Sequence, residues 1–195
     1  MKVIGIAGTN GGGKDTVGKL LAERHGFLFI SVSDLLREEC RARGLEVARE
    51  NLRMISAEWR REYGLGVLVD RAIAKAESFG DRYVGVAAVP MRNVGEAQHV
   101  KDLGGTLVWV DADQRMRYER IQAANRGRAG EDDKTFEEFQ AEELAEMYPP
   151  AGHENDPAVL NMAGVKAICD VTIMNEGSAD KLESLVADLL SETRS

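Results

Sequence analysis

Residues 2–16, KVIGIAGTNGGGKDT, decide the fold of this 195-residue chain. Residues 2–8 form a short apolar run with β-branched side chains, which is typical of a parallel strand buried on both faces. A glycine-rich turn follows, and Val17, Leu20 and Leu21 then recur at helical spacing. This order predicts a loop whose backbone amides surround phosphate oxygens, because glycine permits the backbone angles and the close approach that such a loop needs.

The loop has the spacing G-x-x-x-x-G-K over residues 8–14. Lys14 is expected to direct its charge at the β and γ phosphates of a nucleotide, and the following helix adds the positive end of its dipole. We therefore predict Lys14 as a catalytic residue. The predicted ATP-binding segment comprises Gly8, Thr9, Asn10, Gly11, Gly12, Gly13, Lys14, Asp15 and Thr16.

Asp15 departs from the motif, which normally has a hydroxyl residue for magnesium at this position. A carboxylate is a hard oxygen ligand, so Asp15 is the predicted metal ligand, directly or through water. Alternatively, Asp15 is only an acidic residue of the first helical turn, and Thr16 or a remote acid serves the metal.

Four more short apolar runs alternate with segments of helical periodicity. The predicted strands cover 27–32, 83–89, 106–110 and 171–174, and Ser33 is the predicted N-cap of the helix that ends near Gly44. The other predicted helices cover 46–63, 67–76, 93–104, 114–124, 135–147 and a closing segment around 182–190, with capping-box signals at Asn93/Glu96 and Thr135/Glu138. Strands separated by helices predict an α/β fold with three α/β/α layers and a five-stranded parallel sheet, in a single domain over 1–195.

Composition limits the class of partner. The chain has 33 acidic and 25 basic side chains and a net charge of −8, which argues against a nucleic acid or an anionic membrane as partner. No run reaches the roughly 18 apolar residues of a membrane span, and no signal-peptide core develops at the start. We expect a soluble, cytoplasmic protein that acts on small molecules, with Cys40 and Cys169 as free thiols.

Arginine is unevenly distributed, with seven arginines within 34–62 and five within 115–128. Blocks of this kind can bind phosphate, because the guanidinium fork binds phosphate oxygens bidentately. For most of these arginines we instead expect ion pairs on solvated helix faces. Arg37, Arg92, Arg126 and Arg128 are the expected exceptions, and the acidic run 131–146 is interpreted as a solvated loop and helix.

Several short motifs recur together beside the phosphate-binding loop: SVSDLLR at 31–37, VPMR at 89–92, VDAD at 110–113 and NRGR at 125–128. Together they resemble the P-loop nucleoside monophosphate kinases, the superfamily of adenylate kinase and dephospho-coenzyme A kinase. The resemblance implies a P-loop NTPase fold with a helical acceptor-binding insertion at about 34–76 and a short lid at about 125–147. It further implies a monomeric enzyme that uses Mg²⁺ and transfers the γ-phosphoryl of ATP to a nucleoside monophosphate or a similar small phosphorylated acceptor.

The resemblance also assigns roles to residues outside the loop. The implied acceptor-binding residues are Asp34, Arg37 and Arg92. The implied carriers of transition-state charge, beside Lys14, are Arg92, Arg126 and Arg128. The implied contacts of the ATP base and phosphates are Arg120, Asn175 and Gly177.

Two positions depart from the adenylate kinase pattern. Ala88 lies where those enzymes have the acid that helps to hold magnesium, and Glu96 lies where they have the glutamine that reads AMP. Metal support is therefore expected from Asp15 or Asp34, and acceptors other than AMP stay open. Two alternatives are a dephospho-coenzyme A kinase, in which Asp34 would act as the base, and an ATP-binding regulator that transfers nothing.

Overall fold

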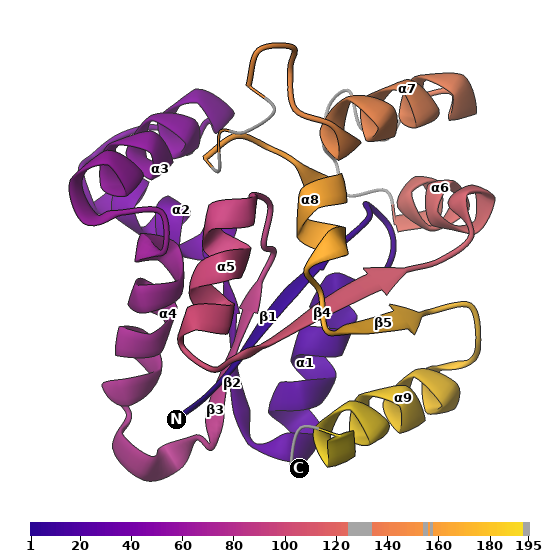
Figure 1. The fold of residues 1–195 in the computed structure, drawn as a ribbon, viewed down its shortest axis with the longest axis horizontal. Helices are drawn as coiled ribbons and strands as arrows, with labels where there is room; N and C mark the ends of the chain where they lie inside the picture. The colour runs from indigo at the N-terminus through magenta and orange to yellow at the C-terminus, as the bar shows by residue number, and fades with distance from the viewer. Residues whose placement is uncertain (125–133, 154–155, 157, 193–195) are drawn as a thin grey trace.

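The computed structural model describes residues 1–124, 134–153, 156 and 158–192 (Figure 1). The strands are β1 (Lys2–Gly8), β2 (Phe27–Ser31), β3 (Gly85–Val89), β4 (Thr106–Asp111) and β5 (Val171–Met174). The helices are α1 (Lys14–His25), α2 (Val32–Ala42), α3 (Arg49–Tyr63), α4 (Val67–Glu77), α5 (Val94–Asp102), α6 (Gln114–Ala124), α7 (Phe136–Met147), α8 (Met162–Ala167) and α9 (Ala179–Glu192), with a 3₁₀ turn, η1, at Gly80–Arg82.

The five strands form one parallel sheet in the order β2-β3-β1-β4-β5. β1, which carries the phosphate-binding loop, is the central strand, and β3 and β4 flank it. Because all strands run in one direction, their carboxyl ends lie at the same edge of the sheet, where ligands of such folds bind. The predicted α/β fold and five-stranded parallel sheet are confirmed.

Helices cover both faces of the sheet (Figure 1). On β1, Ile4 and Ile6 belong to the apolar cluster of α1 and α9, whereas Val3 and Ala7 belong to the cluster on the opposite face with α2, α4, α5 and α8. Side chains of a strand alternate between the two faces, so a strand that is buried on both has an unbroken apolar sequence.

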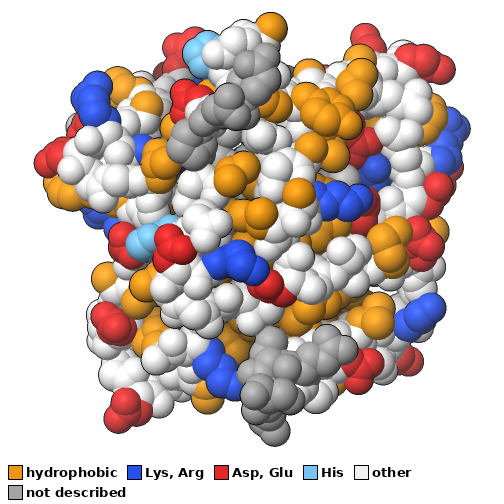
Figure 2. Space-filling view, in the orientation of Figure 1, with side chains coloured by type: hydrophobic (Ala, Val, Ile, Leu, Met, Phe, Trp, Pro, Cys, Tyr) orange, Lys and Arg blue, Asp and Glu red, His pale blue; other side chains and the backbone are white. Residues whose placement is uncertain are grey.

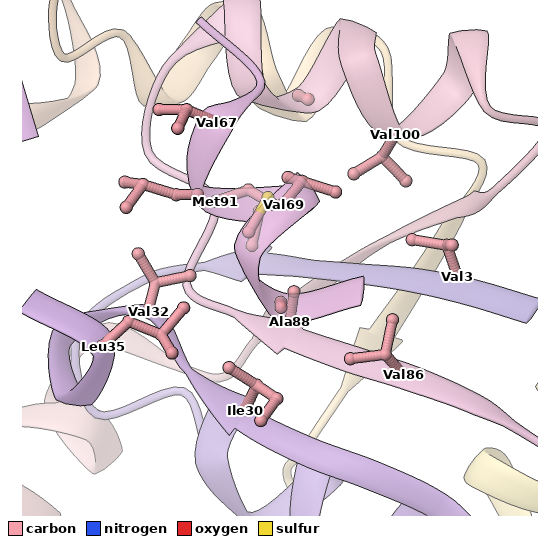
Figure 3. Close-up of a cluster of buried hydrophobic side chains, with 14 of the residues drawn as sticks. Val3, Ile30, Val32, Leu35, Val67, Val69, Val86, Ala88, Met91 and Val100 are labelled. Carbon is pink, nitrogen blue, oxygen red and sulfur yellow. The ribbon is translucent and has the colours of Figure 1, made fainter. Parts of the chain in front are cut away.

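Ala88 lies inside the second of these clusters (Figure 3). It is fully buried and pairs in register with Gly5 of β1 and Ile30 of β2. Val86, Val69 and other apolar side chains pack in the same cluster. The position that holds an acid in adenylate kinases is therefore part of the apolar core in this chain.

Three details differ from the sequence-based expectation. The N-cap of α2 is Ser31 and not Ser33: the Ser31 hydroxyl accepts from the backbone N–H of Asp34 at 3.3 Å. α3 begins at Arg49, because Ala48 is extended. The short helix α8, whose N-cap Asn161 accepts from Gly164 N–H at 2.8 Å, was not predicted, since six residues are too few for a helical apolar period.

α7, whose N-cap is Thr135, has the predicted capping box, with reciprocal hydrogen bonds of 3.2 and 2.8 Å between Thr135 and Glu138. Cys40 and Cys169 are free thiols, as predicted. Among the described helices, none has the length and apolar character that crossing a membrane requires.

Candidate functional site

The phosphate-binding loop follows the carboxyl end of β1 and contains three glycines with positive φ, Gly8, Gly11 and Gly13. Gly8 has φ +139°, and a Cβ there would come within 2.0 Å of the Val110 carbonyl oxygen of β4. Gly13 has φ +101°, and a Cβ there would lie 2.3 Å from Asn175 Nδ2. Both the backbone angle and the space exclude a side chain, which explains why these two positions of the motif are glycine.

The side chain of Lys14 turns back and contacts the backbone of this loop. Its Nζ donates a hydrogen bond to the Thr9 carbonyl oxygen at 2.6 Å. The pKa of Lys14 is lowered to about 8, mainly by burial and also by the nearby charge of Arg92, while the charges of Asp15 and Glu146 oppose the shift. The ammonium group is therefore poorly compensated by the protein itself, which suits a group that receives phosphate charge.

The end of β5 supports the loop from the other side. Asn175 donates its backbone N–H to the Asp111 carbonyl oxygen at 2.7 Å and its Nδ2 to the Gly12 carbonyl oxygen at 2.9 Å. Its own carbonyl oxygen accepts from Arg120 Nη2 at 2.8 Å. The structure thus brings together two of the predicted ATP-side residues, whereas Gly177 is exposed and lies against the side chain of Lys181.

Asp111, at the end of β4, fixes the first part of the loop. Its carboxylate accepts from Thr9 Oγ1 at 2.7 Å and from Trp109 Nε1 at 3.1 Å. Burial opposes ionisation of Asp111, but these hydrogen bonds outweigh it, and the pKa of Asp111 is lowered. The Thr9 hydroxyl therefore already donates its hydrogen bond to an acceptor within the protein. Asp111 is part of the VDAD motif, but the sequence assigned no role to its side chain.

Arg92 lies just after β3, with its side chain about half exposed. Its backbone N–H donates to Glu96 Oε2 at 3.2 Å, and Glu96 Oε1 accepts from Arg60 Nη2 at 2.5 Å. Glu96 is 1% exposed and so has no free edge for reading a base. Asn93 caps α5 by accepting from Glu96 N–H at 2.8 Å, but the Glu96 side chain of the predicted capping box serves Arg92.

The remaining predicted site residues are Asp34 and Arg37 of the acceptor site and Arg126 and Arg128 of the lid. Arg37 Nη1 donates to Asp34 Oδ1 within α2 at 2.5 Å. Arg126 and Arg128 lie outside the described residues.

Arg117 is a site residue that sequence reasoning missed. It is 4% exposed, and it donates from Nε to the Ala112 carbonyl oxygen at 2.8 Å and from Nη1 to the Asn10 carbonyl oxygen at 3.2 Å. Its guanidinium also pairs with the Glu143 carboxylate of α7, with Nη2 3.0 Å from Oε2. The available signal was its spacing: Arg117 lies one helical turn before Arg120 and thus on the same face of α6.

The interpretation of the acidic run as a solvated segment is wrong for two residues of α7. Glu143, with its side chain 14% exposed, is paired with Arg117. Glu146 Oε2 accepts from Asn10 Nδ2 at 3.3 Å, and Glu146 Oε1 lies 3.6 Å from Arg92 Nη1. Glu143 and Glu146 are three residues apart, so they share the helix face that is turned toward the loop.

Arg24, Arg43 and Arg115 form surface ion pairs of the expected kind. On the face shown in Figure 2, basic and acidic side chains are interspersed, with apolar side chains between them. The pairs include Arg24–Glu183, Arg43–Glu39, Arg43–Glu58 and Arg115–Glu119.

The donors suit a magnesium ion held mainly by substrate phosphates. Within residues 1–124, 134–153, 156 and 158–192, no group of three or more His, Cys, Asp or Glu side chains could hold a metal ion. Asp15 is exposed in the first turn of α1, beside Lys14, whereas the Asp34 carboxylate is paired with Arg37. Mg²⁺ commonly uses one or two carboxylates together with phosphate oxygens, and Asp15 fits that requirement.

Comparison with known proteins agrees with this architecture. The family described as AAA domain matches residues 7–139. A UPF0200 protein of Hyperthermus butylicus is 33% identical over 190 residues, which cover 97% of this chain and 93% of the relative. A UPF0200 protein of Thermococcus kodakarensis is 28% identical over 97% of both chains.

Among solved structures, a shikimate kinase from Bacteroides thetaiotaomicron has a TM-score of 0.59 at 15% identity and covers 100% of this chain and 99% of its own. A shikimate kinase from Acinetobacter baumannii, in complex with shikimate, has a TM-score of 0.54 at 18% identity and covers 98% of this chain and 94% of its own. At such identities the likeness concerns the fold alone. The chain therefore belongs to the AAA domain family and to the UPF0200 proteins, and it has the fold of the P-loop small-kinase superfamily.

Proposed function

We propose that the protein is a phosphotransferase that moves the γ-phosphoryl group of Mg-ATP to a nucleoside monophosphate or to a similar small phosphorylated acceptor. The observation that carries the proposal is the approach of two cations from different elements. Lys14 of the phosphate-binding loop and Arg92 after β3 are close enough for Arg92 to lower the pKa of Lys14. Two neighbouring cations, opposed mainly by the partly exposed carboxylate of Glu146, suit a reaction in which two phosphorylated ligands meet end to end.

Each side chain has a distinct task in this proposal. Lys14 and the loop amides hold the β and γ phosphates, and Arg92 holds the phosphate of the acceptor. Asp15 would hold Mg²⁺, which when bound neutralises phosphate charge. No general base is needed, because the nucleophile is already an ionised phosphate oxygen.

The acceptor segment is proposed to be 34–76, which contains all of α3 and most of α2 and α4, with Arg37 as a further phosphate ligand. The lid is proposed to be 125–147, with Arg126 and Arg128 as the cations that cover the transferred group. A cytoplasmic monomer is part of the same proposal.

The test is ADP formation from Mg-ATP across a panel of acceptors: ribonucleoside and deoxyribonucleoside monophosphates, dephospho-coenzyme A, and shikimate, which is bound in one structural neighbour. Turnover with a monophosphate supports the proposal. Turnover with dephospho-coenzyme A or shikimate alone would show that the acceptor group is a hydroxyl and not a phosphate. The absence of turnover with every compound of the panel would favour the alternative of an ATP-binding regulator that transfers nothing.

The role of Arg92 is tested in the same assay. We expect Arg92→Ala to lower kcat/KM for the acceptor by roughly 100-fold or more, as removal of one transition-state donor does. Arg115→Ala is the matched control, because Arg115 is exposed and paired with Glu119 on the surface of α6. An Arg92→Ala protein with the activity of the control would refute the assignment.

A further inference from the structure

Glu146 brings a carboxylate to the groups that a phosphate would use. Near the end of α7, its Oε2 accepts from Asn10 Nδ2 of the phosphate-binding loop at 3.3 Å. Its Oε1 lies 3.6 Å from Arg92 Nη1, and its negative charge raises the pKa of Lys14. A donor and two cations from separate parts of the chain therefore surround one carboxylate.

This environment favours an anion and disfavours a metal ion. A divalent cation beside Glu146 would face the charges of Lys14 and Arg92, and like charges at this range repel. Nucleotide phosphates, in contrast, need these cations, and they would be repelled by the Glu146 carboxylate if it stayed in place.

The position of Glu146 is set by a buried contact on the same helix. One turn earlier, Glu143 pairs with Arg117 and accepts from Gln114 Nε2 at 2.6 Å. Arg117 is itself bonded to the Asn10 carbonyl oxygen. α7 is therefore attached to the phosphate-binding loop directly through Glu146 and indirectly through Glu143 and Arg117, and both acids are partly exposed.

We infer that Glu146 is an internal competitor of the nucleotide: its carboxylate occupies part of the phosphate site in the free protein, and bound phosphates displace it together with the end of α7. This inference rests on the nucleotide-binding part of the proposed function and not on any acceptor. It makes Glu146 a residue that sets ATP affinity, because a ligand binds with an affinity reduced by the fraction of protein in which its site is open.

The test measures binding of a non-hydrolysable Mg-ATP analogue by isothermal titration calorimetry. Glu146→Gln keeps the shape of the side chain and removes its charge. We expect this variant to bind the analogue roughly three- to tenfold more tightly, because it loses a weak, partly exposed ion pair with Arg92 and the repulsion between the Glu146 carboxylate and the phosphates. Glu142→Gln is the matched control: Glu142 lies on the same helix, is 57% exposed and is paired with Lys134 at 2.6 Å. It removes the same charge and should leave the affinity unchanged.

Inorganic triphosphate serves as a second probe, and it should show the same tightening because the competition concerns phosphate alone. Glu146→Asp, whose carboxylate is one methylene shorter, provides a second variant if the glutamine protein is unfolded by circular dichroism, and it too should bind more tightly. Unchanged or weaker binding by the folded variants would overturn the inference. A protein that binds the analogue but phosphorylates no acceptor would refute the proposed function while leaving this inference standing.

Discussion

Replacement of Lys14 by methionine should stabilise the free protein. Burial lowers the pKa of Lys14 from 10.5 to about 8, which means that the folded state disfavours the ammonium form. At about 1.4 kcal/mol per pH unit, the charged lysine destabilises the folded state by about 3 kcal/mol at neutral pH. Methionine has a similar length and no charge, so it removes this penalty.

The net gain is smaller, because methionine also removes a hydrogen bond. Lys14 Nζ donates to the Thr9 carbonyl oxygen at 2.6 Å, and such a bond contributes about 1 kcal/mol. The Thr9 carbonyl oxygen keeps a second donor, Gly12 N–H at 3.2 Å, and is not left without a partner. We expect Lys14→Met to raise the free energy of unfolding by about 2 kcal/mol at pH 7.

The pH dependence has a defined sign. Below pH 8 both the folded and the unfolded chain hold the proton on Lys14, and the penalty is complete. Between pH 8 and 10.5 the unfolded chain binds more protons, so wild-type stability rises with pH relative to the variant. With pKa values of about 8 and 10.5, the advantage of Lys14→Met should shrink by about 1 kcal/mol from pH 7 to pH 9.

Urea unfolding of both proteins at pH 7 and pH 9, without nucleotide, measures these differences. Lys19→Met is the control, because Lys19 is exposed on the same helix and should change the stability little at either pH. A Lys14→Met protein less stable than wild type at pH 7, or a stability difference that does not narrow at pH 9, would refute the electrostatic account of the loop.

Three further outcomes are expected. Glu96→Ala should lower the free energy of unfolding by about 3 kcal/mol in urea titrations, because it leaves the Arg60 guanidinium and the Arg92 N–H without their buried acceptor. Gly13→Ala should abolish measurable Mg-ATP binding in calorimetry, because its φ of +101° and the 2.3 Å approach to Asn175 force the loop to move. Asp15→Ala should raise the magnesium concentration needed for half-maximal turnover, roughly tenfold, without changing the fold.

Each of these outcomes can fail in a specific way. An unchanged urea midpoint for Glu96→Ala would show that the Arg60 pair stabilises nothing. Wild-type ATP affinity in Gly13→Ala would contradict the geometry of the loop, and Gly44→Ala is its control, since Gly44 also has positive φ but has no atom near its missing side chain. Unchanged magnesium dependence in Asp15→Ala would leave Asp15 as an ordinary first-turn acid.

The sequence by itself determined the features that are encoded locally. Strand, loop and helix follow one another in residues 2–25, and apolar period, glycine positions and capping residues are read within a few positions of each other. The parallel α/β sheet follows from the same short-range patterns, since a helix between two strands makes them parallel. The errors in secondary structure were short-range as well: the N-cap of α2 is Ser31 and not Ser33, and α8 was too short for its helical period to be seen.

Only the tertiary structure decided how distant side chains complete the site. Asn10 and Glu146 are 136 positions apart, Thr9 and Asp111 are 102 apart, and Arg117 and Glu143 are 26 apart. Periodicity shows which side chains share a helix face, but not which face of another element they meet. The acids of α7 therefore had the sequence pattern of a solvated helix. Because that helix packs against the phosphate-binding loop and α6, Glu146 contacts Asn10 and Arg92, and Glu143 pairs with Arg117.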